Sequence, residues 1–308
     1  MAGFANYMVP VLIGAPDNNN SPKTFSTTSH SGGGIGAYLA GLWEGDGHIW
    51  IPQTSHAPSN KRYTPHFCIT FNALDHPLAL ELQSMLGGYL RNKEDNNAYV
   101  LVITNLAGLA NVIGLISPYV RTPKVNQLNM LITWMNTNSS NNFDLVSPCT
   151  SHVLSDGWLA GFIDADGSFD IRVREKAAGH SKDRVEARFR LEQRMTDPNT
   201  GNSYGPVLTL ITDALGVKLN TSTHGGTSYY IIALTSPAKA AILINYLDNY
   251  PLFTSKFLNY SDYKVCVDLM VSKQHLTAEG RAKAKILQSG MNSTRTFYSW
   301  DHLARLGK

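Results

Sequence analysis

The sequence predicts an α+β protein built from two pseudo-symmetric αββαββα halves, each with an antiparallel sheet. The segment AYLAGLWEGDGHIWI recurs 120 residues later as GWLAGFIDADGSFDI, and the helix and strand patterns that follow each copy have the same order. The chain has 308 residues, of which 43% are hydrophobic and 16% charged, a composition typical of a globular protein. This length is sufficient for one large core or two modest ones.

Hydrophobic periodicity predicts the elements of each half in chain order. In the first half we expect strands at 48–53 and 62–72, a helix at 76–86, strands at 88–92 and 98–104, and helices at 105–116 and 124–136. In the second half we expect strands at 168–175 and 184–193, a helix at 206–215, strands at 217–223 and 228–235, and helices at 237–249, 255–271 and 277–289. The halves then span 35–136 and 153–308, joined by an Asn-, Ser- and Thr-rich linker at 137–152.

The alternation of apolar and charged residues is strongest in the first two predicted strands of the second half. Apolar and charged residues alternate along 168–174 and 184–192, so one face is apolar and the other is charged. Solvation alone explains such a face, but a two-stranded ribbon also fits the DNA major groove, where arginine contacts guanine. We therefore predict that five arginines contact DNA: Arg172, Arg174, Arg184, Arg188 and Arg190. The matching face of the first half is less basic and consists of His48, Trp50, Arg62, Thr64, His66 and Thr70.

The overall composition excludes several classes of protein. No apolar run reaches the roughly 18 residues of a membrane span, so we expect no membrane partner. The three cysteines are far apart, which argues against a disulfide framework and against a thiolate zinc site. The net charge is +3, divided as −1 over residues 1–150 and +4 over residues 151–308. This mild excess permits DNA binding but does not demand it.

Each repeated segment is predicted to end a helix at an acidic residue, Asp46 or Asp166. Small residues before each aspartate, such as Gly41 and Gly161, allow the two helices to approach closely. Pairing the helices brings the two carboxylates together, where they oppose the helix dipoles and repel each other. A divalent cation removes both penalties, so the pair predicts a metal site. The alternative is that each Asp-Gly is an ordinary turn into a strand.

The nonapeptides LAGLWEGDG and LAGFIDADG resemble the motif of LAGLIDADG homing endonucleases, and the resemblance covers roughly residues 35–290. It implies that the two sheets form a DNA-binding saddle, and that both strands of a specific site are hydrolysed across the minor groove to leave 3′ overhangs. It also implies Mg²⁺ as the cofactor, as two or three divalent ions, with Mn²⁺ or Ca²⁺ able to occupy the same sites. Because the motif occurs twice in one chain, we expect a monomer.

The resemblance assigns metal ligands within this sequence. Asp46 and Asp166 supply carboxylates, and the adjacent backbone carbonyls of Gly45 and Ala165 complete the expected ligand set. Two further acidic residues in the motifs are not expected to bind metal and are interpreted as support for the helix ends: Glu44 and Asp164.

The resemblance also implies basic and water-orienting residues near the metals. Lys124 and Lys256 each follow a turn before a late helix and are expected to stabilise phosphate charge or help to activate water. Solvated helix starts are the alternative for both lysines. Gln193, at the end of a strand, matches a water-positioning glutamine, whereas its counterpart in the first half is Phe71 or, in a shifted register, Asn72.

The N-terminal 34 residues are predicted to be an exon-like segment followed by a flexible tether. The run NYMVPVLIGAPD, at residues 6–17, resembles part of cytochrome c oxidase subunit 1, and a Gly/Ser-rich stretch follows it. A short docking segment is the alternative. Such a segment is expected where translation continues in frame from an upstream exon into an intron. The resemblance therefore implies a mitochondrial intron as the source of the chain and the mitochondrion as its location.

Three other functions compete with DNA cleavage. An RNA-splicing maturase that binds its own intron RNA, with or without cleavage, is the main alternative. An intein is disfavoured because residue 1 is neither Cys nor Ser and the chain does not end in His-Asn. A DNA-binding regulator on the same scaffold is disfavoured because both aspartates are present.

Overall fold

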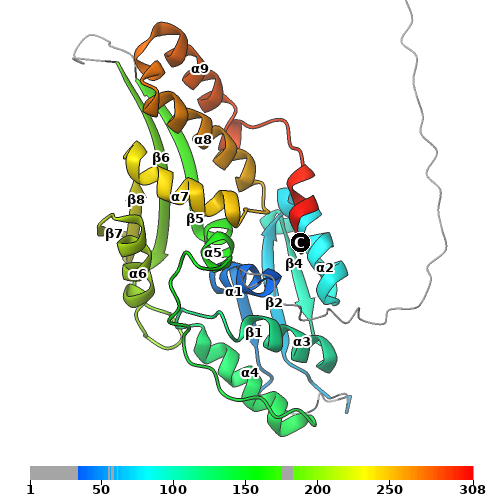
Figure 1. Cartoon of the computed structure of the whole chain (residues 1–308). Coiled ribbons are helices and arrows are strands. Elements are labelled where there is room, and N and C mark those ends of the chain that lie inside the picture. The colour runs from blue at the N-terminus through cyan, green and yellow to red at the C-terminus, as the bar shows by residue number, and fades with distance from the viewer. Residues whose placement is uncertain (1–33, 55, 57–58, 61, 175–182, 308) are drawn as a thin grey trace, which may run out of the picture.

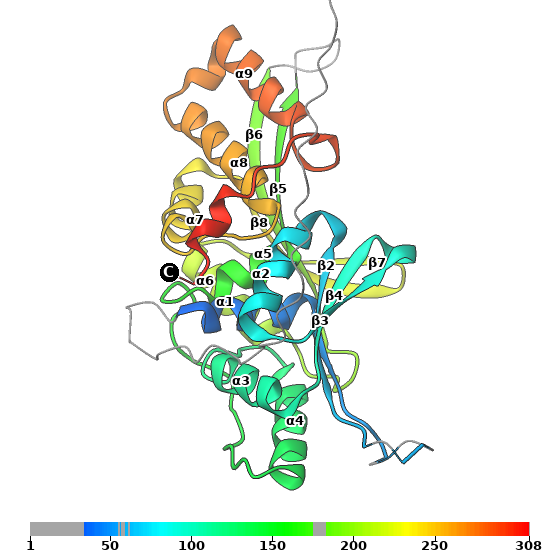
Figure 2. The same cartoon turned by 90° about the vertical axis from the view of Figure 1, so that its right-hand side faces the viewer.

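The computed structural model describes residues 34–54, 56, 59–60, 62–174 and 183–307. The predicted exon-like segment and nearly all of the tether lie outside these residues. The described chain forms two four-stranded antiparallel sheets, ordered β1-β2-β4-β3 and β5-β6-β8-β7, and each sheet carries helices on one side (Figures 1 and 2). The predicted α+β class and its two pseudo-symmetric halves are confirmed. No helix in the described part of the chain combines the length and apolarity needed to cross a membrane.

The first half contains α1 (Gly34–Asp46), β1 (Gly47–Trp50), β2 (His66–Asn72), α2 (His76–Leu86), β3 (Tyr89–Lys93), β4 (Ala98–Ile103), α3 (Leu106–Ile116) and α4 (Val125–Asn138). The second half contains α5 (Trp158–Asp166), β5 (Gly167–Arg174), β6 (Arg184–Arg194), α6 (Gly205–Leu215), β7 (Leu219–His224), β8 (Thr227–Leu234), α7 (Pro237–Asn249), α8 (Lys256–Val271) and α9 (Ala278–Ser289). All the predicted elements are present, most within two residues of the expected bounds.

The first hairpin is shorter than predicted. β1 ends at Trp50 instead of residue 53, and β2 begins at His66 instead of residue 62. Pro52 and Pro65 lie next to these ends, and proline cannot donate a ladder hydrogen bond. Beyond the strands, His56 and Arg62 form an isolated bridge. Consequently, two residues predicted to contact DNA from a strand lie in the loop instead: Arg62 and Thr64.

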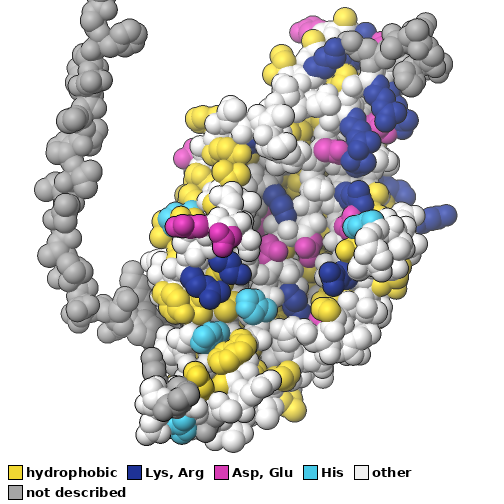
Figure 3. Space-filling model, turned by 180° about the vertical axis from the view of Figure 1, so that it is seen from behind, with side chains coloured by type: hydrophobic (Ala, Val, Ile, Leu, Met, Phe, Trp, Pro, Cys, Tyr) yellow, Lys and Arg dark blue, Asp and Glu magenta, His cyan; other side chains and the backbone are white. Residues whose placement is uncertain are grey.

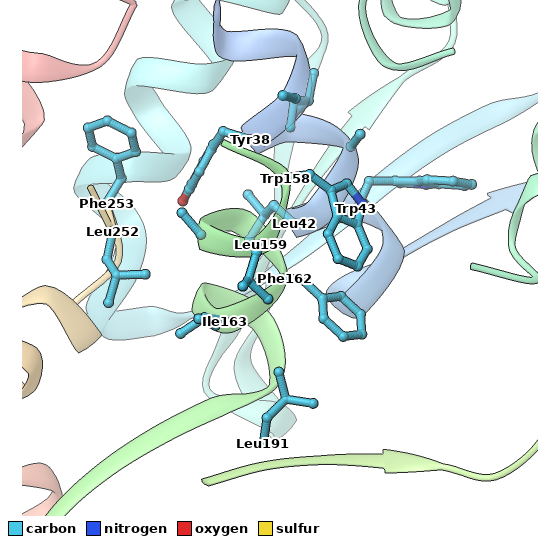
Figure 4. Close-up of a cluster of buried hydrophobic side chains, with 14 of the residues drawn as sticks. Tyr38, Leu42, Trp43, Trp158, Leu159, Phe162, Ile163, Leu191, Leu252 and Phe253 are labelled. Carbon is cyan, nitrogen blue, oxygen red and sulfur yellow. The ribbon is translucent and has the colours of Figure 1, made fainter. Parts of the chain in front are cut away.

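The two motif helices pack against each other at the centre of the molecule, and one hydrophobic core extends across both halves (Figure 4). A Cβ added at Gly41 would lie 1.9 Å from the carbonyl oxygen of Trp158. In the equivalent place on α5, a Cβ at Gly161 would lie 2.0 Å from the carbonyl oxygen of Tyr38. Both positions therefore require glycine, and the prediction of a close helix pair is confirmed.

The chain beyond α9 returns to the first half, although the sequence suggested only a tail there. Residues 291–307 run from α9 to the outer side of α2, where the C-terminus lies (Figure 1). His302 is buried, bonds the carbonyl oxygen of Phe253 through Nε2 at 3.1 Å and stacks on Phe257. Gly307 lies next to Met85 of α2. This C-terminal segment therefore joins α8 to the first half.

Candidate active site

The paired helices end with Asp46 and Asp166 side by side. A Cβ added at Gly45 would lie 2.1 Å from the Cβ of Ala165 and 3.2 Å from Oδ2 of Asp166. The Asp166 carboxylate therefore lies against the end of α1. Asp46 is exposed and Asp166 is half-buried, so the pair is accessible from solvent.

The surroundings of these aspartates disfavour their charged forms. Burial and the nearby charge of Asp46 raise the pKa of Asp166 to about 6, although Lys256 and Lys124 act in the opposite direction. Partial removal from water likewise raises the pKa of Asp46. Oδ2 of Asp166 is covered and has no hydrogen-bond partner among the described residues. A bound cation would satisfy this oxygen and favour both charged forms, so the residues present fit a divalent metal ion.

Two lysines lie at the ends of the motif helices. Nζ of Lys124 donates to the carbonyl oxygens of Gly45 at 2.9 Å and Gly47 at 2.7 Å. Nζ of Lys256 donates to the carbonyl oxygens of Asp164 at 2.6 Å and Ala165. The structure thus brings both predicted lysines to the predicted carbonyl ligands. Burial lowers the pKa of Lys124, although the neighbouring carboxylates act in the opposite direction.

Each lysine begins a helix whose preceding turn is bound to the other acidic residue of its motif. Oε1 of Glu44 accepts hydrogen bonds from the backbone N–H of Thr122 and from its hydroxyl, both at 2.5 Å. Asp164 accepts from the N–H of Thr254 at 3.2 Å and from its hydroxyl at 2.5 Å. The interpretation of these acids as structural support agrees with these contacts.

The two threonines were missed by the sequence analysis. The hydroxyl oxygen of each accepts the backbone N–H of the lysine two residues later, at 3.2 Å in both halves. The signal was present as the repeated Thr-X-Lys in RTPK and FTSK. These threonines link the acids to the start of the lysine helices.

Strand register identifies the residue that replaces Gln193 in the first half. Gly47 pairs with Ile69 and Gly167 pairs with Leu191, so Phe71 is the equivalent of Gln193. Phe71 is buried in the core, whereas Gln193 is half-buried and hydrogen-bonds to Tyr204. The alternative counterpart, Asn72, instead caps the short helix at 73–75. The water-positioning group predicted for the second half therefore has no polar equivalent in the first.

The outer face of the second sheet carries the predicted arginines together with the acidic residues of the same charged alternation, and the structure pairs the two kinds. Ion pairs join Arg188 to Asp170 at 2.7 Å, Arg184 to Glu186 at 2.6 Å, and Arg190 to Glu192. A further ion pair joins Arg172 to Asp170 at 3.4 Å. In Figure 3, which views the side opposite α1 and α5, Lys and Arg side chains gather mainly over the second half with acidic side chains among them. This face is therefore less basic than its arginines alone suggested.

The first sheet presents aromatic and imidazole side chains on the corresponding face. Trp50 is 43% exposed, packs on His66 with 4.8 Å between ring centroids, and contacts Tyr63. Burial, assisted by the charges of Lys124, Lys93 and Arg91, lowers the pKa of His48. His66 has a pKa lowered by burial and by Arg91. The lowered pKa values favour the neutral forms of both histidines, whereas two cations missed in the sequence, Arg91 and Lys93 of β3, supply positive charge near them.

Arg62 differs from the other predicted DNA contacts. Its guanidinium donates to the carbonyl oxygen of Asn138 at 3.1 Å and to Oδ1 of the same residue at 3.0 Å. It also lies over the ring of Trp134 in α4. Arg62 therefore anchors the first hairpin to α4. Thr64 and Thr70 are half-buried.

The fold and the paired carboxylates define a nuclease scaffold with two motif helices. The sequence profile described as LAGLIDADG endonuclease matches residues 39–135 and 159–267. The chain belongs to this family, which confirms the resemblance stated above and the prediction that it is an endonuclease.

Relatives and solved structures agree with this assignment. The uncharacterized cox1 intron-2 37.2 kDa protein of Schizosaccharomyces pombe is 31% identical over 266 residues, which cover 82% of this chain and 71% of that protein. The intron-encoded DNA endonuclease aI3 of Saccharomyces cerevisiae is 27% identical, with 96% of this chain and 81% of that protein covered. The crystal structure of the I-LtrWI LAGLIDADG homing endonuclease bound to target DNA has a TM-score of 0.64 at 17% identity, covering 85% of this chain and 99% of that chain.

Proposed function

We propose that this chain is a site-specific homing endonuclease that cuts both strands of duplex DNA by metal-dependent phosphodiester hydrolysis. The observation that carries the proposal is the pair of accessible carboxylates at the adjoining ends of α1 and α5. One of these carboxylates has a covered oxygen without a hydrogen-bond partner among the described residues. Cleavage across the minor groove with 3′ overhangs is part of this proposal.

Asp46, Asp166 and the carbonyl oxygens of Gly45 and Ala165 would hold the divalent ions. When bound, Mg²⁺ supplies charge stabilisation and a more acidic water for hydrolysis. A solved structure with a similar fold shows I-SmaMI bound to its uncleaved DNA target in the presence of calcium ions. We propose that Mn²⁺ or Ca²⁺ can also occupy these sites in this chain.

The protein's own groups contribute in three ways. Lys124 and Lys256 place ammonium groups beside the two aspartates, where they stabilise negative charge on the phosphate. Gln193 orients a water molecule in the second half. The tight pairing of α1 and α5 fixes the separation of the two aspartates, so the reacting groups need little reorganisation.

DNA is proposed to lie along the outer faces of the two sheets. Arg172, Arg174, Arg184, Arg188 and Arg190 would contact it in the second half, and His48, Trp50, Thr64, His66 and Thr70 in the first. Asp170, Glu186 and Glu192 hold several of these arginines in fixed orientations and can themselves accept from cytosine amino groups. Arg62 is proposed to act by positioning the first hairpin.

The names of the relatives and the predicted exon-like segment support a proposal for the biological setting. The matched proteins from Schizosaccharomyces pombe and Saccharomyces cerevisiae carry intron designations in their names. We propose that this chain is likewise encoded in a mitochondrial intron, acts in the mitochondrion as a monomer, and cuts the intronless allele.

The test is cleavage of the intronless exon junction that contains the codons for Leu12–Asp17. Purified protein with Mg²⁺ should linearise a plasmid carrying this junction. EDTA, or a junction interrupted by intron sequence, should prevent cleavage. Asp46→Asn should retain binding to the same DNA, because affinity resides mainly in phosphate and base contacts. If the wild-type protein produced no double-strand break on this junction or on a randomised duplex library, the proposed activity would be wrong.

A further inference from the structure

Two buried hydrogen bonds cross the interface between the motif helices in equivalent places. Oη of Tyr38 in α1 donates to Oδ2 of Asp164 in α5 at 2.7 Å. Nε1 of Trp158 in α5 donates to Oε2 of Glu44 in α1 at 2.5 Å. The donors occupy the same motif position 120 residues apart, as do the acceptors. Each half therefore supplies a donor to the acidic residue of the other.

The two acceptors also bind the turns that precede the lysine helices. Asp164 bonds the N–H of Phe253 at 2.6 Å as well as both donors of Thr254. The Thr254 hydroxyl then accepts the N–H of Lys256, and Nζ of Lys256 lies at the end of α5. Tyr38, in the first half, is thus connected to Lys256, in the second.

The reciprocal connection begins at Trp158. Glu44 accepts the N–H of Arg121 at 3.0 Å and both donors of Thr122, whose hydroxyl accepts the N–H of Lys124. The acceptors Glu44 and Asp164 are 0% and 3% exposed. Because water cannot replace a lost donor at such a site, the carboxylate must shift toward its remaining partners. Those partners are the threonines that fix each lysine.

We propose that Tyr38 and Trp158 are positioning residues that act across the helix pair, so that each half orients the lysine of the other. This inference rests on the proposed nuclease function and extends it. It predicts that the two strand cleavages are coupled in a crossed manner. Loss of the Tyr38 donor slows the cleavage supported by Lys256, and loss of the Trp158 donor slows the cleavage supported by Lys124.

A purely structural role for these donors has a different consequence. If they only hold the helices together, their loss loosens one shared interface and affects both strands alike. The rate ratio between the two strands therefore separates the two roles. Tyr38→Phe is a clean perturbation because the ring packs edge-on against Phe253, with 4.9 Å between centroids, and the ring is retained (Figure 4).

The chain offers a matched control in Tyr246. Its hydroxyl is also buried against α5, accepting the N–H of Ala160 at 2.9 Å and donating to the carbonyl oxygen of Asp156 at 2.8 Å. It makes no bond to either acidic residue. Tyr246, which belongs to α7, therefore allows a comparable hydroxyl against α5 to be removed by Tyr246→Phe without removing a hydrogen bond to Glu44, Asp164 or either threonine.

The experiment measures single-turnover cleavage of a duplex labelled separately on each strand, at saturating Mg²⁺. The duplex carries the site that the wild-type protein cuts, selected from a randomised library where needed. We expect Tyr38→Phe to slow one strand roughly five- to tenfold relative to the other. Trp158→Phe should slow the opposite strand. Tyr246→Phe should leave the strand ratio unchanged.

A second pair of variants tests the same connection without touching the helix interface. Thr254→Val removes the hydroxyl that links Asp164 to Lys256 and should reproduce the strand bias of Tyr38→Phe. Thr254→Ser keeps the hydroxyl and should restore the wild-type ratio. Equal slowing of both strands by Tyr38→Phe, or a bias that Thr254→Val does not share, would overturn the inference. Absence of cleavage by the wild-type protein would instead refute the proposed function, and the inference with it.

Discussion

Asp166→Asn should stabilise the metal-free protein while abolishing double-strand cleavage. The folded environment raises the pKa of Asp166 from 3.8 to about 6, first through burial and second through Asp46. The folded state therefore binds the proton more tightly than the unfolded state. Between these two pKa values stability falls as pH rises, and above the folded pKa the whole penalty is present.

The size of the effect follows from the shift. One pKa unit corresponds to about 1.4 kcal/mol, so a shift of roughly two units corresponds to about 3 kcal/mol as an upper bound. Asp166 is only half-buried, so solvent screening reduces this figure, and we expect a gain of about 1–3 kcal/mol. For a chain of this length that corresponds to a rise in Tm of roughly 2–5 °C.

The assay is thermal unfolding in EDTA at pH 7.5 and at pH 4. The variant should be more stable than the wild type at pH 7.5, and the difference should shrink at pH 4, where the wild-type carboxyl is largely protonated. Added Mg²⁺ should raise the Tm of the wild type more than that of the variant, because the ligand binds the folded state. Asp164→Asn is the matched contrast. Burial also raises the pKa of Asp164 to about 6, but its carboxylate accepts four hydrogen bonds. An amide has one acceptor oxygen and would leave buried donors unpaired, so this variant should destabilise the protein. Lower stability of Asp166→Asn than of the wild type at pH 7.5 would refute the electrostatic argument.

Three further predictions concern assembly, packing and strand preference. Light scattering after size-exclusion chromatography should give a mass near 33.8 kDa in the absence of DNA, and a stable dimer would contradict the single-chain site. Gly161→Val should destabilise the protein by at least about 3 kcal/mol in urea unfolding, because its Cβ would lie 2.0 Å from the carbonyl oxygen of Tyr38, and near-wild-type stability would disprove the close packing. The strands should be cut at unequal rates, because Phe71 stands where the second half has Gln193, and a nicked intermediate with a fixed strand preference should accumulate. Equal rates without such an intermediate would remove that argument.

The sequence was sufficient to predict the duplication, the order of the elements and the residues that meet at the helix ends. All of these depend on local patterns: repeated motifs, period-two strands and glycines at helix contacts. The errors at the first hairpin were local too, since Pro52 and Pro65 mark where the strands stop.

The residues that were missed depend on contacts between distant segments. Thr122 and Thr254 gain their importance from acidic residues that lie 78 and 90 positions away. The return of residues 291–307 to α2 has no periodic signal at all. Partners such as Asp170 were visible in the sequence, but their pairing with Arg188 required the register of β5 and β6.

The further contacts that hold the turns before Lys124 and Lys256 differ between the two halves. Strand register makes Asp75 and Asp197 equivalent, yet Asp75 accepts the N–H of Ser255 in the other half at 2.7 Å, whereas Asp197 binds residues of its own loop. The turn before Lys124 is instead held through Arg121, whose guanidinium binds the linker and Asp156 at 2.9 Å. The acid–threonine–lysine arrangement is thus common to both halves, while the contacts that brace it differ. Because these contacts lie in different segments, a substitution can alter the position of one lysine without altering the other. The strand preference of such an enzyme can therefore change while the shared helix pair is retained.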